Sequence, residues 1–175
     1  MQEDQLIKRV LDGNPRAQKE FYQLFAPKMY GVSLRFARDR DEANDILQEG
    51  FVKIFTNLKS YRGDGSLEGW IRRTIVNTAI NYYKKNSKHH TYADLDTVMI
   101  FEKSQDVSAL DQMSASELLE HIGKLPDGYR TVFNLNIIEG YTHKEIGDML
   151  DISENTSKSQ LSRARAYLQK RIERK

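Results

Sequence analysis

Closely spaced helix-capping residues near the C-terminus constrain this chain more than any other feature of its sequence. Thr142 and Glu145 form the T-x-x-E pattern of a capping box, which marks the start of a helix. Ser153 is a natural N-cap for a further helix, with Asp151 and Ile152 in the turn between the two. The spacing predicts two helices joined by a very short turn, which is the arrangement of a helix-turn-helix.

The second of these helices has an apolar side and a polar side. The apolar side is a stripe of residues at helical spacing: Leu161, Ala164, Leu168 and Ile172. The opposite side carries short polar and basic residues: Asn155, Thr156, Ser159, Ser162, Arg163 and Lys170. Residues 153–175 hold seven Lys or Arg and two Glu, a net charge of +5. Such a helix suits the major groove of DNA, although any helical hairpin with a solvated basic face shares part of the pattern.

The composition excludes several classes of protein. The 175 residues include no cysteine, so there is no disulfide framework, thiolate metal site or thiol nucleophile. No apolar run reaches the roughly 18 residues that would suggest a membrane span, and the acidic N-terminus lacks a signal-peptide pattern. No catalytic, metal-ligand or phosphate-loop pattern is present. We therefore expect a soluble cytoplasmic protein that is not an enzyme and has no catalytic residue, metal or cofactor.

Charge is unevenly distributed along the chain, although the formal net charge is only +2. Residues 61–90 carry a net charge of +4 and residues 91–127 one of −6, so two basic segments flank an acidic one. Helical periodicity predominates and strand signals are scarce. We expect an all-α protein with two small helical domains, residues 1–88 and 113–175, joined by a flexible acidic linker over residues 89–112.

Periodicity and capping residues predict the helices of each domain. In the first domain they are expected over residues 3–11, from Asn14 to about Arg38 with a restart or kink at Pro27, and over residues 41–58 and 66–85. In the second domain one helix is expected from near Ser114 to before Pro126 and another up to Gly140, ahead of the helix-turn-helix.

The helix expected over residues 41–58 has an outer face that suits a protein partner. When its apolar stripe is buried, this face shows Asp45, Gln48, Glu49 and Val52. A solvated acidic face is the common alternative. An apolar residue beside two carboxylates on the solvent side nevertheless favours contact with a basic partner.

The helix expected over residues 66–85 carries a second candidate surface. Its side opposite the core shows Trp70, Arg73, Asn77, Ile80, Asn81 and Lys84, next to a loop with Lys59, Tyr61 and Arg62. Basic groups contact phosphates and aromatic rings stack on unpaired bases, so this surface suits unpaired DNA as well as duplex DNA. Trp70 could equally well lie in the core as on this surface. The alternative for the face as a whole is a basic surface that only contacts solvent.

Five motifs, in order over nearly the whole chain, match one family. Asp45–Phe55, with the sequence D-I-L-Q-E-G-F-V-K-I-F, is similar to the D-L-V-Q-E-x-F-x-x-x-W/F signature of region 2 in extracytoplasmic-function (group IV) sigma factors of bacterial RNA polymerase. Tyr61-Arg62 followed by Trp70–Asn77 resembles F-R…W-L-x-x-I-A-x-N of the same region. Leu125–Arg130, Glu139–Ile146 and Thr156–Arg165 resemble the region 4 patterns L-P-x-x-x-R, E-G-x-S-x-x-E-I-A and T-V-K-S-R-L-x-R-A-R.

The resemblance implies a role for each candidate surface in a sigma factor that gives RNA polymerase its promoter specificity. The acidic face, including Val52, would bind the clamp helices of the β′ subunit. The loop over residues 59–66 and the outer face of residues 70–84 would recognise and melt the −10 element. At the −35 element, the contacts to base edges would come from Asn155, Thr156, Ser159 and Arg163. The contacts to phosphates would come from Lys158, Gln160, Arg165 and Lys170, and Ser162 lies on the same face. The implied partners are core polymerase (also through its β flap), promoter DNA and an anti-sigma factor, without membrane insertion.

The chain departs from the family pattern at several positions. Ser157 replaces the usual apolar residue, Gln160 the usual Arg and Asn81 a usual Asp, so promoter preference cannot be transferred from other members. Two other functions remain open at this point. A stand-alone DNA-binding regulator would bind duplex DNA tightly without polymerase. A helical nucleic-acid enzyme would need the metal or nucleophile cluster that this sequence lacks.

Overall fold

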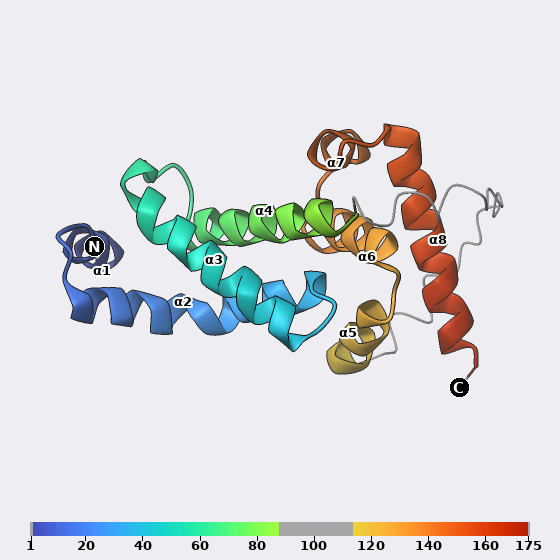
Figure 1. Cartoon of the computed structure of the whole chain (residues 1–175), viewed down its shortest axis with the longest axis horizontal. Coiled ribbons are helices and arrows are strands. Elements are labelled where there is room, and N and C mark those ends of the chain that lie inside the picture. The colour runs from blue at the N-terminus through green and yellow to red at the C-terminus, as the bar shows by residue number, and fades with distance from the viewer. Residues whose placement is uncertain (1, 88–113, 175) are drawn as a thin grey trace. The chain divides into compact units, whose positions relative to one another are not determined.

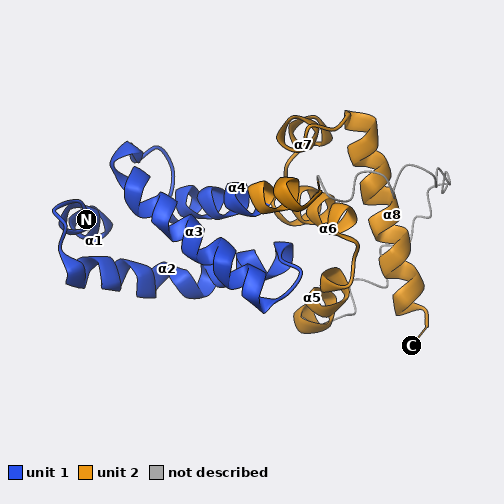
Figure 2. Cartoon of the chain, in the orientation of Figure 1, with its two compact units in different colours: residues 1–79 blue, residues 80–175 orange. Residues whose placement is uncertain are grey.

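The structure is a computed structural model that describes residues 2–87 and 114–174, and all its secondary structure there is helical (Figure 1). The all-α class predicted from the sequence is therefore confirmed for the described residues. The chain divides into two compact units, residues 1–79 and 80–175 (Figure 2). This division falls inside a helix, before the predicted domain end at residue 88. The predicted linker over residues 89–112 lies outside the described residues.

The first unit begins with helices whose ends are set by local capping. Its helices are α1 (Gln2–Leu11), α2 (Pro15–Phe36), α3 (Arg40–Asn57) and the part of α4 (Leu67–Ser87) up to Ala79, with a short 3₁₀ turn at Leu58–Ser60. The Asn14 side chain accepts from the backbone N–H groups of Arg16 and Ala17, as expected. Ser66 Oγ accepts from the Gly69 N–H at 3.0 Å, which is the predicted cap of α4. The cap of α3 is Asp39, slightly earlier than the predicted start at Asp41.

Pro27 does not restart α2, which excludes the first of the two alternatives, a restart or a kink, that the sequence left open. The helix runs from Pro15 to Phe36 with Pro27 inside it. Proline removes one hydrogen bond and crowds the preceding turn. This local cost is offset because α2 buries an apolar face on both sides of Pro27: Ala17, Phe21, Phe25, Ala26, Met29, Val32 and Phe36. Tertiary packing therefore overrides the local signal of the proline.

The core of the first unit is an aromatic cluster between α2 and α3, with α4 packed closely on α3. The Phe21 ring lies 4.9 Å from Phe25 and 5.5 Å from Phe55 between centroids. Gly50 occupies the buried stripe of α3, and a Cβ there would overlap the side chain of Ile75 on α4. Ile75 is itself fully buried. The glycine thus allows α3 and α4 to approach closely. The opposite side of α3 remains exposed.

The second unit contains the predicted helix-turn-helix. Its described helices include α5 (Ala115–Gly123), α6 (Asp127–Phe133) with a π-helical turn (Asn134–Ile138), α7 (His143–Leu150) and α8 (Glu154–Ile172). The capping box of α7 is confirmed: the Glu145 N–H donates to Thr142 Oγ1 at 3.2 Å, and the Thr142 N–H donates to Glu145 Oε2 at 2.7 Å. Ser153 Oγ caps α8 by accepting from the Thr156 N–H at 3.0 Å.

The turn between α7 and α8 packs directly against α7 at Gly147. Asp151 adopts the left-handed conformation (φ 56°), and the Ile152 N–H donates to the Gly147 carbonyl at 3.0 Å. A Cβ on Gly147 would lie only 2.7 Å from the Ile152 carbonyl oxygen. The short turn therefore depends on the missing side chain at residue 147.

A buried arginine fixes the start of α6. Arg130 is 3% exposed, and its guanidinium donates to the Leu125 carbonyl at 2.9 Å and to Asp127 Oδ1 at 2.7 Å. The L-P-x-x-x-R motif of the sequence is thus a structural element here, because a buried cation is tolerated when it is paired and hydrogen-bonded.

Replacing Gly147 with alanine should destabilise the second unit. The new Cβ would meet backbone, which cannot move aside as a flexible side chain can, so we expect a loss of about 1–3 kcal/mol in the free energy of unfolding. The measurement is urea unfolding of the full chain followed by circular dichroism. Gly123→Ala is the matched control, because nothing lies within 4 Å of a Cβ at that position in the same unit. Equal stability of the two variants would contradict the proposed role of Gly147.

Candidate nucleic-acid and protein-binding surfaces

The acidic face of α3 is on the surface of the first unit. Asp45 and Gln48 are exposed, and Val52 is 66% exposed despite being apolar. Glu49 is half-buried, and its Oε1 lies 2.7 Å from Lys53 Nζ. Ile46 and Ile54 are buried on the other side of the same helix. One-sided burial therefore presents all four predicted residues on one solvent-facing surface, which we name the acidic face.

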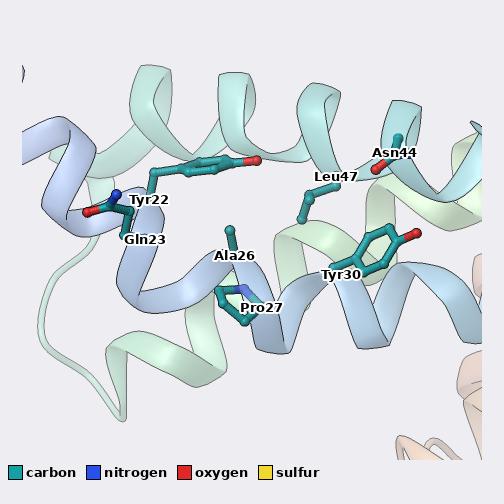
Figure 3. Close-up of a pocket in the computed structure, with 7 residues that line it drawn as sticks. All are labelled: Tyr22, Gln23, Ala26, Pro27, Tyr30, Asn44 and Leu47. Carbon is teal, nitrogen blue, oxygen red and sulfur yellow. The ribbon is translucent and has the colours of Figure 1, made fainter.

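An apolar hollow of about 360 Å³ lies between α2 and α3, beside the acidic face. Figure 3 shows Tyr22 and Tyr30 of α2 at its two ends, with Ala26 and Leu47 between them. Asn44 and Leu47 also line the hollow and directly precede Asp45 and Gln48 in the sequence. Sequence reasoning missed this feature. The signal was the recurrence of Tyr22, Ala26 and Tyr30 every four residues, next to the core stripe of α2.

The exposed strip of α4 is narrower than predicted. Arg73, Asn77 and Asn81 are exposed and recur every four residues, so they form one line along the helix. Trp70 and Lys84 are half-buried. Ile80 was expected on this outer face, but it is only 4% exposed, which corrects the prediction. α4 buries Val76 and Ile80 in addition to Ile71, Ile75 and Ala79, because burying an aliphatic side chain is favourable on any side that meets a neighbour.

The loop before α4 folds back on Trp70. The rings of Tyr61 and Trp70 have centroids 5.8 Å apart. The Tyr61 hydroxyl donates to the Gly65 carbonyl at 2.8 Å and closes the loop. Gly63 and Gly65 have φ values of 78° and 94°, a conformation that favours glycine. Trp70 is therefore half-buried with its ring tilted against that of Tyr61, neither a core residue nor a fully exposed one.

Lys59 and Arg62 are exposed around this aromatic pair. The pair thus has cationic side chains close to it in the sequence and is followed along α4 by the Arg73–Asn77–Asn81 line, of which Asn81 belongs to the second unit. Aromatic rings with surrounding positive charge are suited to stacking on bases whose phosphates the cations neutralise. We name Lys59, Tyr61, Arg62 and Trp70 the aromatic loop.

Most predicted residues of α8 are exposed on one side of the helix. The exposed set is Asn155, Thr156, Lys158, Ser159, Ser162, Arg165 and Lys170, with Arg163 half-buried. Lys158 pairs with Glu154 at 3.2 Å, and Thr156 Oγ1 lies 2.8 Å from Ser153 Oγ. The buried side carries Ser157, Leu161, Ala164 and Leu168. α8 therefore presents a polar and basic surface that starts in its first turn.

Gln160 departs from this pattern. It is half-buried, and its Oε1 is buried without a hydrogen-bond partner. That oxygen is turned toward Gly128 of α6, where a Cβ would lie 3.4 Å from it. The amide carbonyl thus faces the protein interior, and its placement makes Gln160 a weaker candidate for a phosphate contact than the sequence suggested.

Comparison with known proteins supports the sequence resemblance. Residues 21–89 match the family Sigma-70 region 2, and residues 115–168 match Sigma-70, region 4. The RNA polymerase sigma-H factor of Pseudomonas aeruginosa is 27% identical, covering 98% of this chain and 94% of its own length. The ECF RNA polymerase sigma factor SigM of Bacillus subtilis is 30% identical, covering 85% of this chain and 91% of its own length.

Solved structures show a related fold. The sigma factor RpoE from Bartonella quintana, solved in complex with the anti-sigma factor NepR, superposes with a TM-score of 0.51 at 19% identity, covering 87% of this chain and 94% of that one. Within residues 2–87 and 114–174, no helix is long and apolar enough to cross a membrane. Given the two matched regions and a relative 30% identical over most of its length, the chain belongs to the extracytoplasmic-function sigma factors, the non-enzymatic subunits with which RNA polymerase initiates transcription.

Proposed function

We propose that this sigma factor recognises a promoter through two separate DNA contacts, one from each compact unit. The observation that carries the proposal is that two basic surfaces lie in different units. The aromatic loop with Arg73 and Asn77 of α4 lies in the first unit, and the outer side of α8 lies in the second. Two weak contacts on one chain reinforce each other only when a scaffold fixes their spacing. Core polymerase supplies that scaffold, so the isolated chain should bind DNA poorly.

We assign the outer side of α8 to the major groove of the −35 element. In a helix-turn-helix the first turns of the second helix contact base edges, and Asn155, Thr156 and Ser159 are exposed in those turns. Arg163 follows as a further base-edge residue, because its guanidinium is suited to bidentate contact with guanine. Lys158, Arg165 and Lys170 are placed to neutralise phosphates, which position a protein without reading sequence.

The aromatic loop and the α4 line are assigned to the −10 element. Strand separation there requires a surface that stabilises unpaired bases. Tyr61 and Trp70 supply π faces, while Lys59, Arg62 and Arg73 supply positive charge. Asn77 and Asn81 add amide groups that can donate to and accept from base edges.

The acidic face is assigned to the clamp helices of the β′ subunit. Its carboxylates complement a basic partner and would steer association, and Val52 offers an exposed apolar contact on the same face. The adjoining hollow would receive an apolar side chain of the same partner. We further propose contact between the second unit and the β flap, action in the cytoplasm, and control by an anti-sigma factor, for which the NepR complex of the Bartonella relative is the support.

Run-off transcription tests the proposal as a whole. Purified core polymerase is incubated with a library of promoter fragments, with and without the full chain, and the transcripts are sequenced. Promoter-specific transcripts that require the chain are expected. Tight, sequence-specific duplex binding by the chain alone, without any effect on core polymerase, would instead favour a stand-alone regulator.

Replacing Arg163 with alanine should relax base preference at one position of the −35 element. Loss of one base-edge contact should reduce discrimination at that position by about 1–3 kcal/mol. Arg165→Ala is the matched control, since loss of a phosphate contact should weaken binding about equally for all sequences and lower the salt dependence. Transcription from promoter libraries randomised in the −35 element measures the base preference of both variants. An unchanged preference at every position in the Arg163 variant would contradict the assignment.

Replacing Glu49 with lysine should weaken binding to core polymerase without unfolding the chain. The reversed charge would face a basic partner and also lie beside Lys53, so we expect an affinity loss of roughly tenfold or more. Glu20→Lys on α2 makes the same charge change at an exposed position outside the acidic face. Competition for core polymerase against a labelled sigma factor measures both. Equal affinities of the two variants would remove the acidic face from the interface.

Replacing Tyr61 with alanine should impair promoter opening while core binding is retained. Loss of one stacking ring should decrease the population of open complexes by about tenfold, within the range of single base–aromatic contacts. Tyr61→Phe keeps the ring and loses only the hydrogen bond to Gly65, so it should remain close to wild type. Permanganate reactivity of unpaired thymines measures opening. A phenylalanine variant as defective as the alanine variant would show that loop closure, and not stacking, matters.

A further inference from the structure

Ser157 is a fully buried hydroxyl in the recognition helix. It lies on the buried side of α8 with Leu161 and Ala164, and its exposed fraction is 0%. A buried hydroxyl without a partner is unfavourable. Its partner is the His143 ring, whose Nδ1 lies 2.8 Å from Ser157 Oγ. The departure from an apolar residue at this position is therefore matched by a specific polar contact.

The hydrogen bond connects the beginning of α7 to the second helix of the motif. His143 is the first residue of α7, directly after the Thr142 cap. Toward the other end of α7, the Ile152 N–H bonds to the Gly147 carbonyl and holds the turn against the helix. Two separate hydrogen bonds thus attach α8 and the turn that precedes it to α7. Apolar contact is non-directional, whereas a hydrogen bond requires a defined distance and angle.

The attachment point is next to the residues assigned to base contacts. Asn155, Thr156 and Ser159 are exposed within the same two turns of α8 that contain Ser157. A small rotation of α8 about its own axis would turn these side chains toward or away from the base edges, while most apolar contacts between α8 and α7 would remain. An interaction that prevents the rotation therefore affects which base edges they reach.

We propose that the hydrogen bond between His143 and Ser157 is a positioning contact that fixes the rotation of α8 against α7 and so sets the −35 base preference of this chain. The inference rests on the proposed −35 role of α8. His143 and Ser157 act through the residues of the exposed side, and neither contacts a base.

Burial and the neighbouring charges favour the neutral form of His143 in the folded chain by lowering its pKa. Burial lowers the pKa of His143 below 6.5, Lys158 and Arg165 lower it further, and Glu154 acts in the opposite direction. A neutral ring can donate to or accept from Ser157, whereas a charged ring can only donate. Because the pKa is lower in the folded than in the unfolded chain, the unfolded state takes up a proton first as the pH falls through 6.5. The stability of the second unit should therefore decrease in that range.

The test uses full-length variants with core polymerase and promoters randomised in the −35 element. Ser157→Ala and His143→Ala should shift the base preference in the same direction. Their double variant should differ from the sum of the single effects by at least about twofold in relative promoter usage, as contacting residues do. His143→Asn can form the same hydrogen bond without titrating, so it should restore the wild-type preference.

Two readouts separate positioning from general loss of stability. The ¹⁵N chemical shift of the His143 Nδ1 should change in Ser157→Ala. It should not change in Ser33→Ala, which removes an equally buried hydroxyl that donates to the Met29 carbonyl of its own helix. Lowering the pH from about 7.5 to about 5.5 should also reduce the melting temperature of wild type more than that of His143→Asn.

The outcomes distinguish this inference from the proposed function. If wild type yields no promoter-specific transcripts, the proposed function fails and the positioning role with it. If wild type is promoter-specific but Ser157→Ala and His143→Ala keep its −35 preference, only the positioning role is overturned. A preference that shifts in both alanine variants and returns in His143→Asn supports it, and a shift that His143→Asn does not reverse overturns it.

Discussion

Burial of the apolar stripe of α3 is the interaction on which the first unit depends. The stripe packs into the aromatic cluster of α2 on one side and approaches α4 closely at Gly50. Because α3 buries one side only, the carboxylates and Val52 must remain in solvent. The same packing leaves the apolar hollow at the seam of α2 and α3. Core formation and the exposure of a charged surface are therefore two results of a single arrangement.

The second unit is stabilised by polar contacts as well as by its small apolar core. The capping box of α7, the cap of α8 and the paired guanidinium of Arg130 satisfy groups that would otherwise be costly in a small helical body. Gly147 lets the turn pack closely on α7, so α8 begins at a fixed distance from it. The outer side of α8 makes no core contacts, so short polar and basic residues are tolerated there.

Local chemistry explains what the sequence alone could predict. The caps at Asn14, Thr142 and Ser153 depend on neighbours within a few residues and were correctly placed. The apolar stripe of α8 was correct for Leu161, Ala164 and Leu168, whereas Ile172 at the end of the helix is only half-buried. The exposure of the acidic face followed from the period of one helix. These features need no knowledge of how distant segments meet.

Features that depend on several elements were missed or wrong. Pro27 stays within α2 because of the apolar face that the helix buries on both sides of it. Ile80 is buried because α4 is covered on more than one side, and Gln160 turns inward because α6 leaves room at Gly128. The hollow and the contact between His143 and Ser157 each join residues of two helices. A pattern along one helix contains no information about such pairs.

The position of Trp70 gives this protein a natural optical label. Trp70 is the single tryptophan of the chain, and it lies half-buried against Tyr61 in the loop assigned to strand opening. Indole emission depends on polarity and on nearby rings, so the tryptophan fluorescence of the chain originates at this one place. An unlabelled preparation, excited where tyrosine does not absorb, would therefore report insertion of a base beside the loop in real time, without a tryptophan signal from the rest of the fold.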